Sequence, residues 1–275
     1  MQQASDFLNE CRNLYRLLST MDERDLLVET KFKHWTVSDI LRHLIVWDEA
    51  ARLTMQSAEA FQHFFGPIPA YIEANRIRLF ERKVVPEQGI SLTNRWWSNC
   101  QKTAQLYATA DPKIRLKWGG PDLSARTCIT SRLMETWSHS QAIYDEWGIE
   151  RLDHDRIRNI VQIGVQTFSW TFRNRGMNPP GPIPTLELTA PSGVLWRWHN
   201  AESAERILGS ATEFCQVVTQ TRNVADTQLQ VEGFVGGSWM AIAQCFAGPP
   251  SDPPLPGDRR RNVSRESLNP KVLDH

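Results

Sequence analysis

The sequence feature that most constrains the fold is an abrupt change of pattern near residue 178. Residues 178–184 read Asn-Pro-Pro-Gly-Pro-Ile-Pro, and such a run cannot continue a helix, because proline lacks the backbone donor and clashes with the preceding turn. Before this segment apolar residues recur at helical spacing, whereas after it they alternate as in strands. A chain of 275 residues can form one large domain or two modest ones, and the break predicts two.

The first 172 residues read almost entirely as amphipathic helices. Apolar spacing predicts helices at residues 7–18, 37–59, 70–83, 91–108, 127–147 and 155–172. Thr36, followed by Asp39 three residues on, is a predicted N-cap for the second of them. The turn-rich stretch 111–126 reads equally well as a functional loop or as a long connection. We expect an antiparallel helix bundle, a fold in which metal sites are commonly built from facing helices.

The second half has the pattern of a small α+β domain. Residues 185–190 and 194–199 alternate on either side of a Pro-Ser-Gly turn, which predicts a β-hairpin. A helix at 204–219, a strand at 229–234 and a helix at 239–246 are expected to follow. The chain is therefore predicted to be mainly α, with a bundle at 1–175, an α+β domain at 183–249 and a mobile proline-rich tail at 250–275.

Composition excludes several classes of protein. Thirty-one basic residues balance 31 acidic ones, so no overall field attracts nucleic acid or an anionic membrane. The chain has no uncharged apolar run long enough for a membrane span and no signal-like start, and we expect it to be cytoplasmic. Its five cysteines are widely spaced and are interpreted as buried thiols. The expected partner is a small molecule, and the oligomeric state stays open.

One constellation of side chains points to chemistry. Glu135 and His139 stand at positions i and i+4, on one face of a predicted helix that is apolar around much of its circumference. Ionisable groups in such a setting need a partner, and a metal ion is one. His43 lies beside the apolar stripe of helix 37–59 and can reach the same interior. Taken singly, a pair such as Glu135 and His139 is more often a surface pair or ordinary packing than a metal site. A histidine such as His43 is more often a satisfied core residue than a ligand.

The segments Trp35-Thr-Val-Ser-Asp-Ile-Leu-Arg-His43-Leu and Arg132-Leu-Met-Glu135-Thr-Trp-Ser-His139 resemble the metal-binding bundle of the DinB-like superfamily. The closest resemblance is to the branch related to mycothiol-dependent maleylpyruvate isomerase. It implies a divalent metal, usually zinc, held by His43, Glu135 and His139.

The resemblance extends into the second half. Residues 214–222 and 239–250 are similar to a C-terminal extension that carries a wyosine-base-formation label. The family usually has Gly-Gln-Asp after the second histidine, whereas this chain has Ser-Gln-Ala. Asp145, further along the same helix, is expected to support the site from behind.

Two imidazoles and one carboxylate leave a coordination position open, as in catalytic zinc sites. The same ligands also suit Fe²⁺, Ni²⁺ or Mn²⁺. The resemblance implies an isomerase or a transferase that uses a low-molecular-weight thiol, and a Lewis-acid metal equally permits lyase or hydrolase chemistry. Arg126 is a candidate to bind a substrate carboxylate, against the alternative of a solvated loop arginine. We expect aromatic side chains around the metal, among them Trp35, Trp47, Trp118 and Trp137.

Two other functions stay open from the sequence. A carrier protein would bind a hydrophobic small molecule through Trp196, Trp198, Trp239 and Phe246 of the second half. RNA modification follows only from the wyosine label, and the neutral charge disfavours it.

Overall fold

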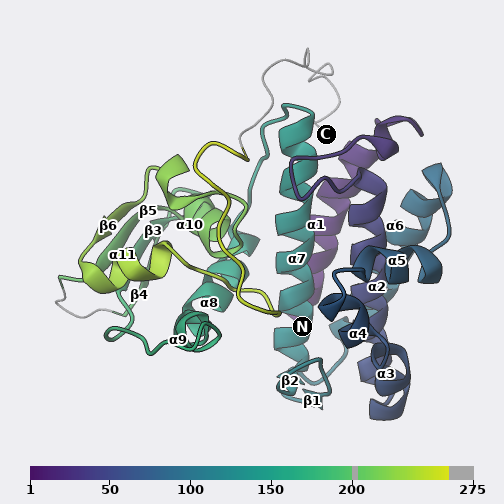
Figure 1. Ribbon diagram of the computed structural model, residues 1–275, viewed down its shortest axis with the longest axis horizontal. Coiled ribbons are helices and arrows are strands. Elements are labelled where there is room, and N and C mark those ends of the chain that lie inside the picture. Colours follow the sequence, from purple (N-terminus) through teal and green to yellow (C-terminus); the bar gives the residue numbers. More distant parts are fainter. Residues whose placement is uncertain (200–203, 260–275) are drawn as a thin grey trace. The chain divides into compact units, whose positions relative to one another are not determined.

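The computed structural model describes residues 1–199 and 204–259, and the chain divides into two compact units between Ile143 and Tyr144 (Figure 1). The first unit is helical, and the second combines helices with a small sheet. The predicted fold class, mainly α with an α+β second part, is confirmed. Within the described ranges, no helix is both long and apolar enough to cross a membrane.

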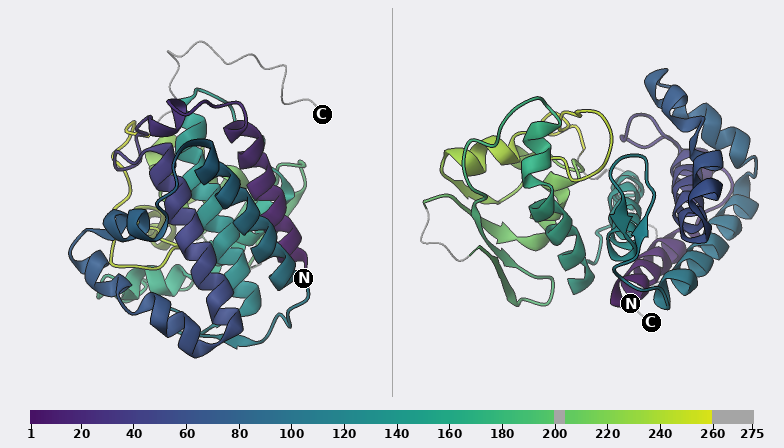
Figure 2. Two further views of the ribbon diagram at one scale, coloured as in Figure 1. Left: turned by 90° about the vertical axis from the view of Figure 1, so that its right-hand side faces the viewer. Right: turned by 90° about the horizontal axis from the view of Figure 1, so that it is seen from below.

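The first unit is built on long helices. Its elements are α1 (Gln2–Leu18), a 3-10 turn (Asp25–Leu27), α2 (Val37–Gln56), α3 (Ala58–Phe65), α4 (Ile68–Glu73), α5 (Ile77–Val84), α6 (Gly89–Ala108), β1 (Arg115–Leu116), β2 (Leu123–Ser124) and α7 (Ala125–Glu146). Helices α1, α2, α6 and α7 run side by side (Figure 2, left), and α6 packs on both α1 and α2. The amino group of Met1 donates to the carbonyl of Ala108, so α1 starts where α6 ends and the two are antiparallel.

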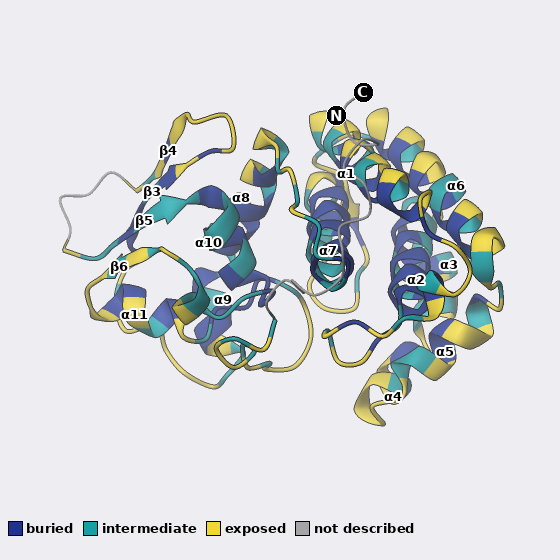
Figure 3. Cartoon of the chain, turned by 90° about the horizontal axis from the view of Figure 1, so that it is seen from above, coloured by how far each residue is buried: buried dark blue, intermediate teal, exposed yellow. Residues whose placement is uncertain are grey.

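Helix α2 forms as its sequence predicts. The hydroxyl of Thr36 accepts a hydrogen bond from the backbone N–H of Asp39, and the Asp39 carboxylate accepts one from the N–H of Thr36. This reciprocal capping box satisfies backbone donors that the first helical turn leaves unpaired. Ile40, Leu41 and Leu44 are fully buried, and Figure 3 shows α2 mostly in the dark colour of buried residues.

Two segments of the first unit differ from the predicted pattern. Residues 70–83 form not one helix but α4 and α5, separated at Asn75, whose φ is +53°. Asparagine tolerates this left-handed conformation, which ends a helix that apolar spacing alone would continue. The turn-rich stretch contains a small antiparallel hairpin, β1 with β2, that leads directly into α7.

The second unit places helices on one face of a four-stranded sheet. Its elements are a 3-10 turn (Asp155–Ile157), α8 (Arg158–Gln166), α9 (Phe168–Arg173), β3 (Thr185–Thr189), β4 (Leu195–Trp198), β5 (Arg206–Ser210), α10 (Ala211–Val218), a 3-10 turn (Val224–Asp226), β6 (Gln230–Glu232) and α11 (Phe234–Met240). The strand order is β4-β3-β5-β6, with β3 parallel to β5 and the other pairs antiparallel. The predicted hairpin is β3 with β4.

The two faces of this sheet differ in polarity, as expected for strands of alternating sequence. Leu186, Leu188 and Ile207 are fully buried on the face that α10 covers. On the other face Glu187 of the central strand forms ion pairs with Arg206 on β5, at 2.6 Å, and with Arg197 on β4, at 3.3 Å. Cross-strand pairs of opposite charge stabilise the register of the strands.

The sequence pattern places the division between the units at the proline-rich segment, residues 178–184. The structure divides the chain earlier, between Ile143 and Tyr144. Residues 155–172, predicted as the last helix of the bundle, form the 3-10 turn, α8 and most of α9, and these pack in the second unit: α8 contacts α10, and Phe168 contacts Trp239 at 5.0 Å between ring centroids. Periodicity shows that a helix has an apolar face but not which partner covers it.

Three further predictions for the second half need correction. The expected helix 239–246 is displaced towards the N-terminus, because α11 ends at Met240. The expected helix 204–219 starts as strand β5, and only α10 is helical, because β5 completes the sheet beside β3. The tail was expected to be mobile from residue 250, but its described part, residues 250–259, is hydrogen-bonded to the second unit. The carbonyl of Ser251 accepts a hydrogen bond from Gln220, and the N–H of Gly257 donates to Asp226. Residues 260–275 lie outside the described part of the chain.

Candidate metal centre

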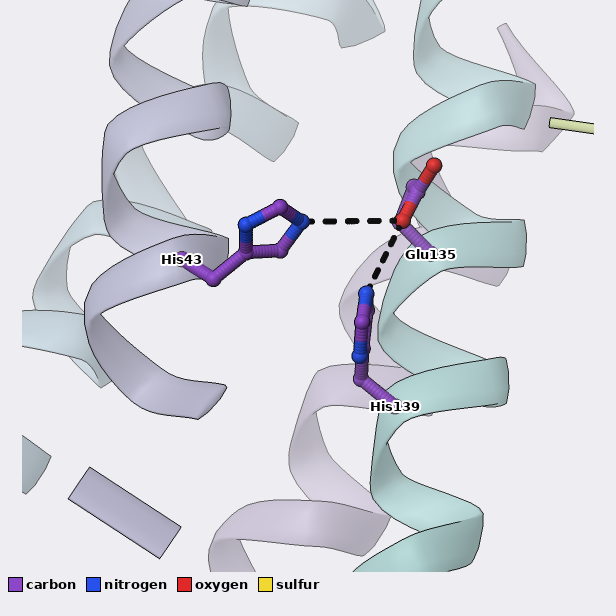
Figure 4. Close-up of side chains that lie close together, drawn as sticks. All are labelled: His43, Glu135 and His139. Carbon is purple, nitrogen blue, oxygen red and sulfur yellow. Dashed lines mark ion pairs between the residues drawn. The ribbon is translucent and has the colours of Figure 1, made fainter. Parts of the chain in front are cut away.

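Helices α2 and α7 bring the three predicted ligands together. His43 comes from α2, and Glu135 and His139 come from successive turns of α7 (Figure 4). One carboxylate oxygen of Glu135 lies 3.2 Å from Nε2 of His139 and 3.9 Å from Nε2 of His43. The three candidate ligand atoms all lie within 4.8 Å of one another. The side chains are 10% to 21% exposed, so the cluster has a route to solvent.

The spacing of these atoms fits a divalent cation. Ligand atoms that each lie about 2.0–2.2 Å from one tetrahedral ion are roughly 3.4 Å apart. The two separations from the Glu135 oxygen, 3.2 and 3.9 Å, bracket that value. Histidine nitrogens with one carboxylate oxygen are also a donor set that zinc and other first-row divalent metals accept.

A fourth residue, Glu81 of α5, completes the cluster, and the sequence did not identify it. Its Oε1 lies 2.7 Å from Nδ1 of His43, and its side chain is only 1% exposed. The other oxygen, Oε2, is buried and has no hydrogen-bond partner. A carboxylate on the far nitrogen of a metal-binding histidine fixes the tautomer and the ring orientation. The sequence did contain one indication of a buried carboxylate here. Glu81 lies at helical spacing with Ile77, Phe80 and Val84, so it interrupts an apolar stripe in which a carboxylate is unexpected.

The two histidines have opposite pKa shifts. Burial by itself lowers the pKa of His43, but the attraction of Glu81 and the hydrogen bonds to Glu135 and Glu81 outweigh burial and raise that pKa to about 9. Burial lowers the pKa of His139 to about 4, against the hydrogen bond to Glu135. The same two hydrogen bonds, from His139 and His43, hold the pKa of Glu135 well below its usual range despite burial. At pH 7 His139 is therefore neutral, which is the ligand form of histidine, whereas His43 carries a proton that a metal ion would displace.

A buried ion pair lies behind the cluster. Asp48 of α2 and Arg132 of α7, both almost fully buried, approach within 2.7 Å. Arg132 is hydrogen-bonded to Asp48, so the carboxylates of Glu81 and Glu135 share the protonated His43 as their nearest hydrogen-bonded cation. A divalent cation would balance these two charges, which is the condition for keeping carboxylates away from water.

Aromatic rings lie beside the cluster, and two of the four tryptophans predicted there, Trp35 and Trp47, contact its histidines. Trp35 lies 5.2 Å from His43 and 5.8 Å from His139 between ring centroids. Trp47 lies 6.1 Å from His43 and 6.1 Å from Trp118. Trp137 is fully buried.

The segment after β1 is held next to these rings. The hydroxyl of Thr54 donates to the carbonyl of Lys117, and Trp118 stacks on Phe61. Gly119 lies against Phe65, where an added Cβ would come within 2.3 Å of the ring, so only glycine fits there without a shift. Trp118 therefore has a fixed place beside Trp47.

The other two predicted site residues do not join the cluster. Arg126 is exposed on the first turn of α7, nine residues before Glu135, which is about 13 Å along a helix. Asp145 is bonded by both carboxylate oxygens to Arg222, at 2.6 and 2.7 Å. It does not support His139, whose Nδ1 has no hydrogen-bond partner. Residues i and i+6 point to different sides of a helix, so helical geometry explains this outcome.

The rings proposed for a hydrophobic ligand in the second unit are partly core residues. Trp239 is 1% exposed and packs between Phe168 and Phe214, at centroid distances of 5.0 and 5.6 Å. Trp196 is 5% exposed. Neither ring is free to receive a ligand without repacking.

Comparison with known proteins identifies the family. The model of the mycothiol maleylpyruvate isomerase N-terminal domain matches residues 7–144, a range that includes His43, Glu81, Glu135 and His139. Uncharacterized proteins from two strains of Mycobacterium tuberculosis are each 33% identical over 220 residues, covering 78% of this chain and 84% of the relative.

Solved structures agree on the fold. The crystal structures of a mycothiol-dependent maleylpyruvate isomerase and of a point mutant of it align with a TM-score of 0.50 at 14% identity, covering 78% of this chain and 87% of theirs. The chain belongs to the mycothiol maleylpyruvate isomerase N-terminal domain family. The family model ends at residue 144, so it does not test the C-terminal resemblance, which stays a prediction.

Proposed function

We propose that this family member is a metal-dependent enzyme that acts on a small organic molecule, with a divalent metal, zinc in the first instance, held by His43, Glu135 and His139. The observation that carries the proposal is the convergence of three ligand atoms within 4.8 Å, from two helices, with Glu81 bonded to the outer nitrogen of His43. A surface pair or an ordinary core histidine needs neither feature.

Each residue of the cluster has a defined task in this proposal. His43 and His139 offer Nε2, and Glu135 offers a carboxylate oxygen. When a metal is bound, Glu81 accepts a hydrogen bond from Nδ1–H of His43, which leaves Nε2 of that ring as the lone-pair donor. A zinc ion bound there would supply Lewis-acid chemistry, by polarising a carbonyl or lowering the pKa of a thiol or water. Asp48 and Arg132 hold α2 and α7 in register behind the ligands.

The surroundings favour a small substrate with apolar or planar parts. Trp35 and Trp47 flank His43 and offer apolar, planar surfaces. Arg132, in the same unit, is already paired with Asp48, so its charge is not offered to a substrate. The related isomerase is named for mycothiol and maleylpyruvate, and thiol-assisted isomerisation of an activated alkene is the reaction we place first. Lyase and thiol-transfer reactions use the same metal chemistry.

Turnover with maleylpyruvate and mycothiol as probes tests the proposal. Protein stripped with a chelator and reloaded with Zn²⁺ should convert maleylpyruvate to the trans isomer or to a thiol adduct, followed by ultraviolet absorbance and NMR. The activity should disappear on chelation and in His139→Ala. Conversion at equal rates in the chelated and zinc-loaded protein would refute metal dependence, and no conversion of any activated alkene in the loaded protein would refute this reaction class.

A further inference from the structure

The two histidines of the cluster are held in different ways. Nδ1 of His43 has a carboxylate partner in Glu81. The side chain of His139 is only 10% exposed, and its Nδ1 is buried and has no hydrogen-bond partner. Nε2 of His139 lies 3.2 Å from Glu135, but a metal bound at Nε2 would replace that hydrogen bond. The final torsion of a histidine side chain is broad, so packing must then fix the direction of the ring.

Two aromatic rings from one short turn pack against the imidazole of His139. The ring of Phe32 meets His139 edge-on, at 5.0 Å between centroids and 81° between planes. Trp35 lies parallel to His139, at 5.8 Å and 4°. Phe32 and Trp35 also contact each other edge-on, at 5.2 Å, so the imidazole lies against a corner made of two perpendicular rings.

The turn that carries these rings has an uncommon backbone. Lys33 and His34, between Phe32 and Trp35, have φ values of +51° and +56°. Turns with two consecutive positive φ values favour asparagine and glycine, and neither is present here. The turn is closed by hydrogen bonds from the N–H of Trp35 to the carbonyl of Phe32 and from the N–H and hydroxyl of Thr30 to the carbonyl of Trp35.

We propose that residues 30–36 form a positioning turn for His139, in which Phe32 and Trp35 fix the imidazole by packing where His43 is fixed by a hydrogen bond. The proposal rests on the proposed metal site. The contacts among the three rings stabilise the left-handed conformation of Lys33 and His34. The closed backbone of residues 30–36 fixes the positions of Phe32 and Trp35. Because Thr36 directly follows and caps α2, the same segment sets the start of the helix that carries His43.

Phe32→Leu tests the turn, with Tyr15→Leu as its control. Tyr15 stacks on Trp97 at 4.8 Å in the same unit, between α1 and α6, so its loss removes a comparable ring contact elsewhere. Phe32→Leu should weaken Co²⁺ binding about tenfold, the lower end of the usual loss for supporting residues around a metal. It should also change the visible absorption of bound Co²⁺, while Tyr15→Leu leaves both unchanged.

A metal-free readout and a rescue variant separate positioning from general stability. In chelated protein, loss of the Phe32 ring current should shift the His139 ring-proton resonances in Phe32→Leu and not in Tyr15→Leu. Adding Lys33→Asn and His34→Gly, the pair that favours this turn, should restore part of the Co²⁺ affinity lost in Phe32→Leu. Parental Co²⁺ affinity and spectrum in Phe32→Leu would overturn the proposal.

The outcome also separates this inference from the proposed function. If the parent binds Co²⁺ and His139→Ala does not, but Phe32→Leu binds as the parent does, the metal site stands and the positioning turn is wrong. If the parent itself binds no Co²⁺, both are wrong.

Discussion

Glu81 is the single residue that most sharply distinguishes a metal centre from an ordinary bundle core. Its carboxylate is almost fully buried, with one oxygen on His43 and the other without a partner. An ionised group in that position is costly unless a nearby positive charge compensates for it. In the metal-free protein the proton of His43 supplies that charge, and a metal ion on Nε2 would supply it through the imidazole.

Replacing Glu81 should weaken metal binding without unfolding the protein. Glu81→Gln keeps an oxygen that accepts from Nδ1 of His43 but loses the charge, and we expect the Zn²⁺ dissociation constant to rise roughly 10-fold to 100-fold. Glu81→Ala should lose more. Calorimetric titration measures both, with Glu87→Gln as the control, because Glu87 pairs with Arg95 and does not contact the cluster. Equal affinities for the three variants and the parent would remove Glu81 from the site.

The Asp48–Arg132 pair should be sensitive to the loss of one partner. Arg132→Met leaves the fully buried Asp48 without its cation, a change that typically costs about 3–5 kcal/mol. The double variant Asp48→Leu with Arg132→Met should recover most of that loss in the free energy of unfolding, measured by urea denaturation. A single variant as stable as the parent would show that the pair is dispensable.

At the scale of elements, the sequence predicted the two helices that carry the ligands better than their surroundings. Helices α2 and α7 are long and strongly periodic, and α2 has its own capping box, so local pattern and tertiary structure agree. The strand β5 and the break at Asn75 depend on sheet pairing and on one left-handed residue, which apolar spacing does not show. Glu81 was missed because helix 70–83 was predicted from apolar spacing without a buried face being assigned to it.

Loss of the Thr36 cap should affect the site through α2. Thr36→Ala removes the hydrogen bond to the N–H of Asp39 and should destabilise the protein by about 1 kcal/mol. His43 lies two turns into the helix, so we also expect a few-fold weaker metal binding. Ser57→Ala, which removes the equivalent bond to Ala60 at the start of α3, should cost similar stability and leave metal affinity unchanged. Thermal unfolding and Zn²⁺ titration distinguish the two.

On the scale of the whole molecule, the five buried cysteines report separately on the two units. Cys11, Cys100 and Cys128 lie in the first unit, and Cys215 and Cys245 in the second. Burial raises the pKa of Cys128 to about 11 and also raises the pKa values of Cys11, Cys100 and Cys215. Thiolate formation is therefore suppressed in the folded state, and labelling requires opening of the unit concerned.

Metal should protect only the first group of thiols. A ligand that binds only the folded state stabilises it by an amount that grows with the logarithm of the free ligand concentration relative to the dissociation constant. We expect stoichiometric Zn²⁺ to slow alkylation of Cys11, Cys100 and Cys128 in mild urea, and to leave Cys215 and Cys245 unaffected. Peptide mass spectrometry after N-ethylmaleimide pulses measures the rates. Equal slowing at all five positions would show that the two units open together.

Metal stoichiometry is the most direct test of the central claim, that His43, Glu135 and His139 form one divalent metal site. Elemental analysis of the protein after chelation, reloading with Zn²⁺ and gel filtration should find one zinc per chain in the parent. His43→Ala and His139→Ala should each retain well under half of that amount while remaining folded by circular dichroism. A parent without stoichiometric metal, or histidine variants with parental metal content, would contradict the account.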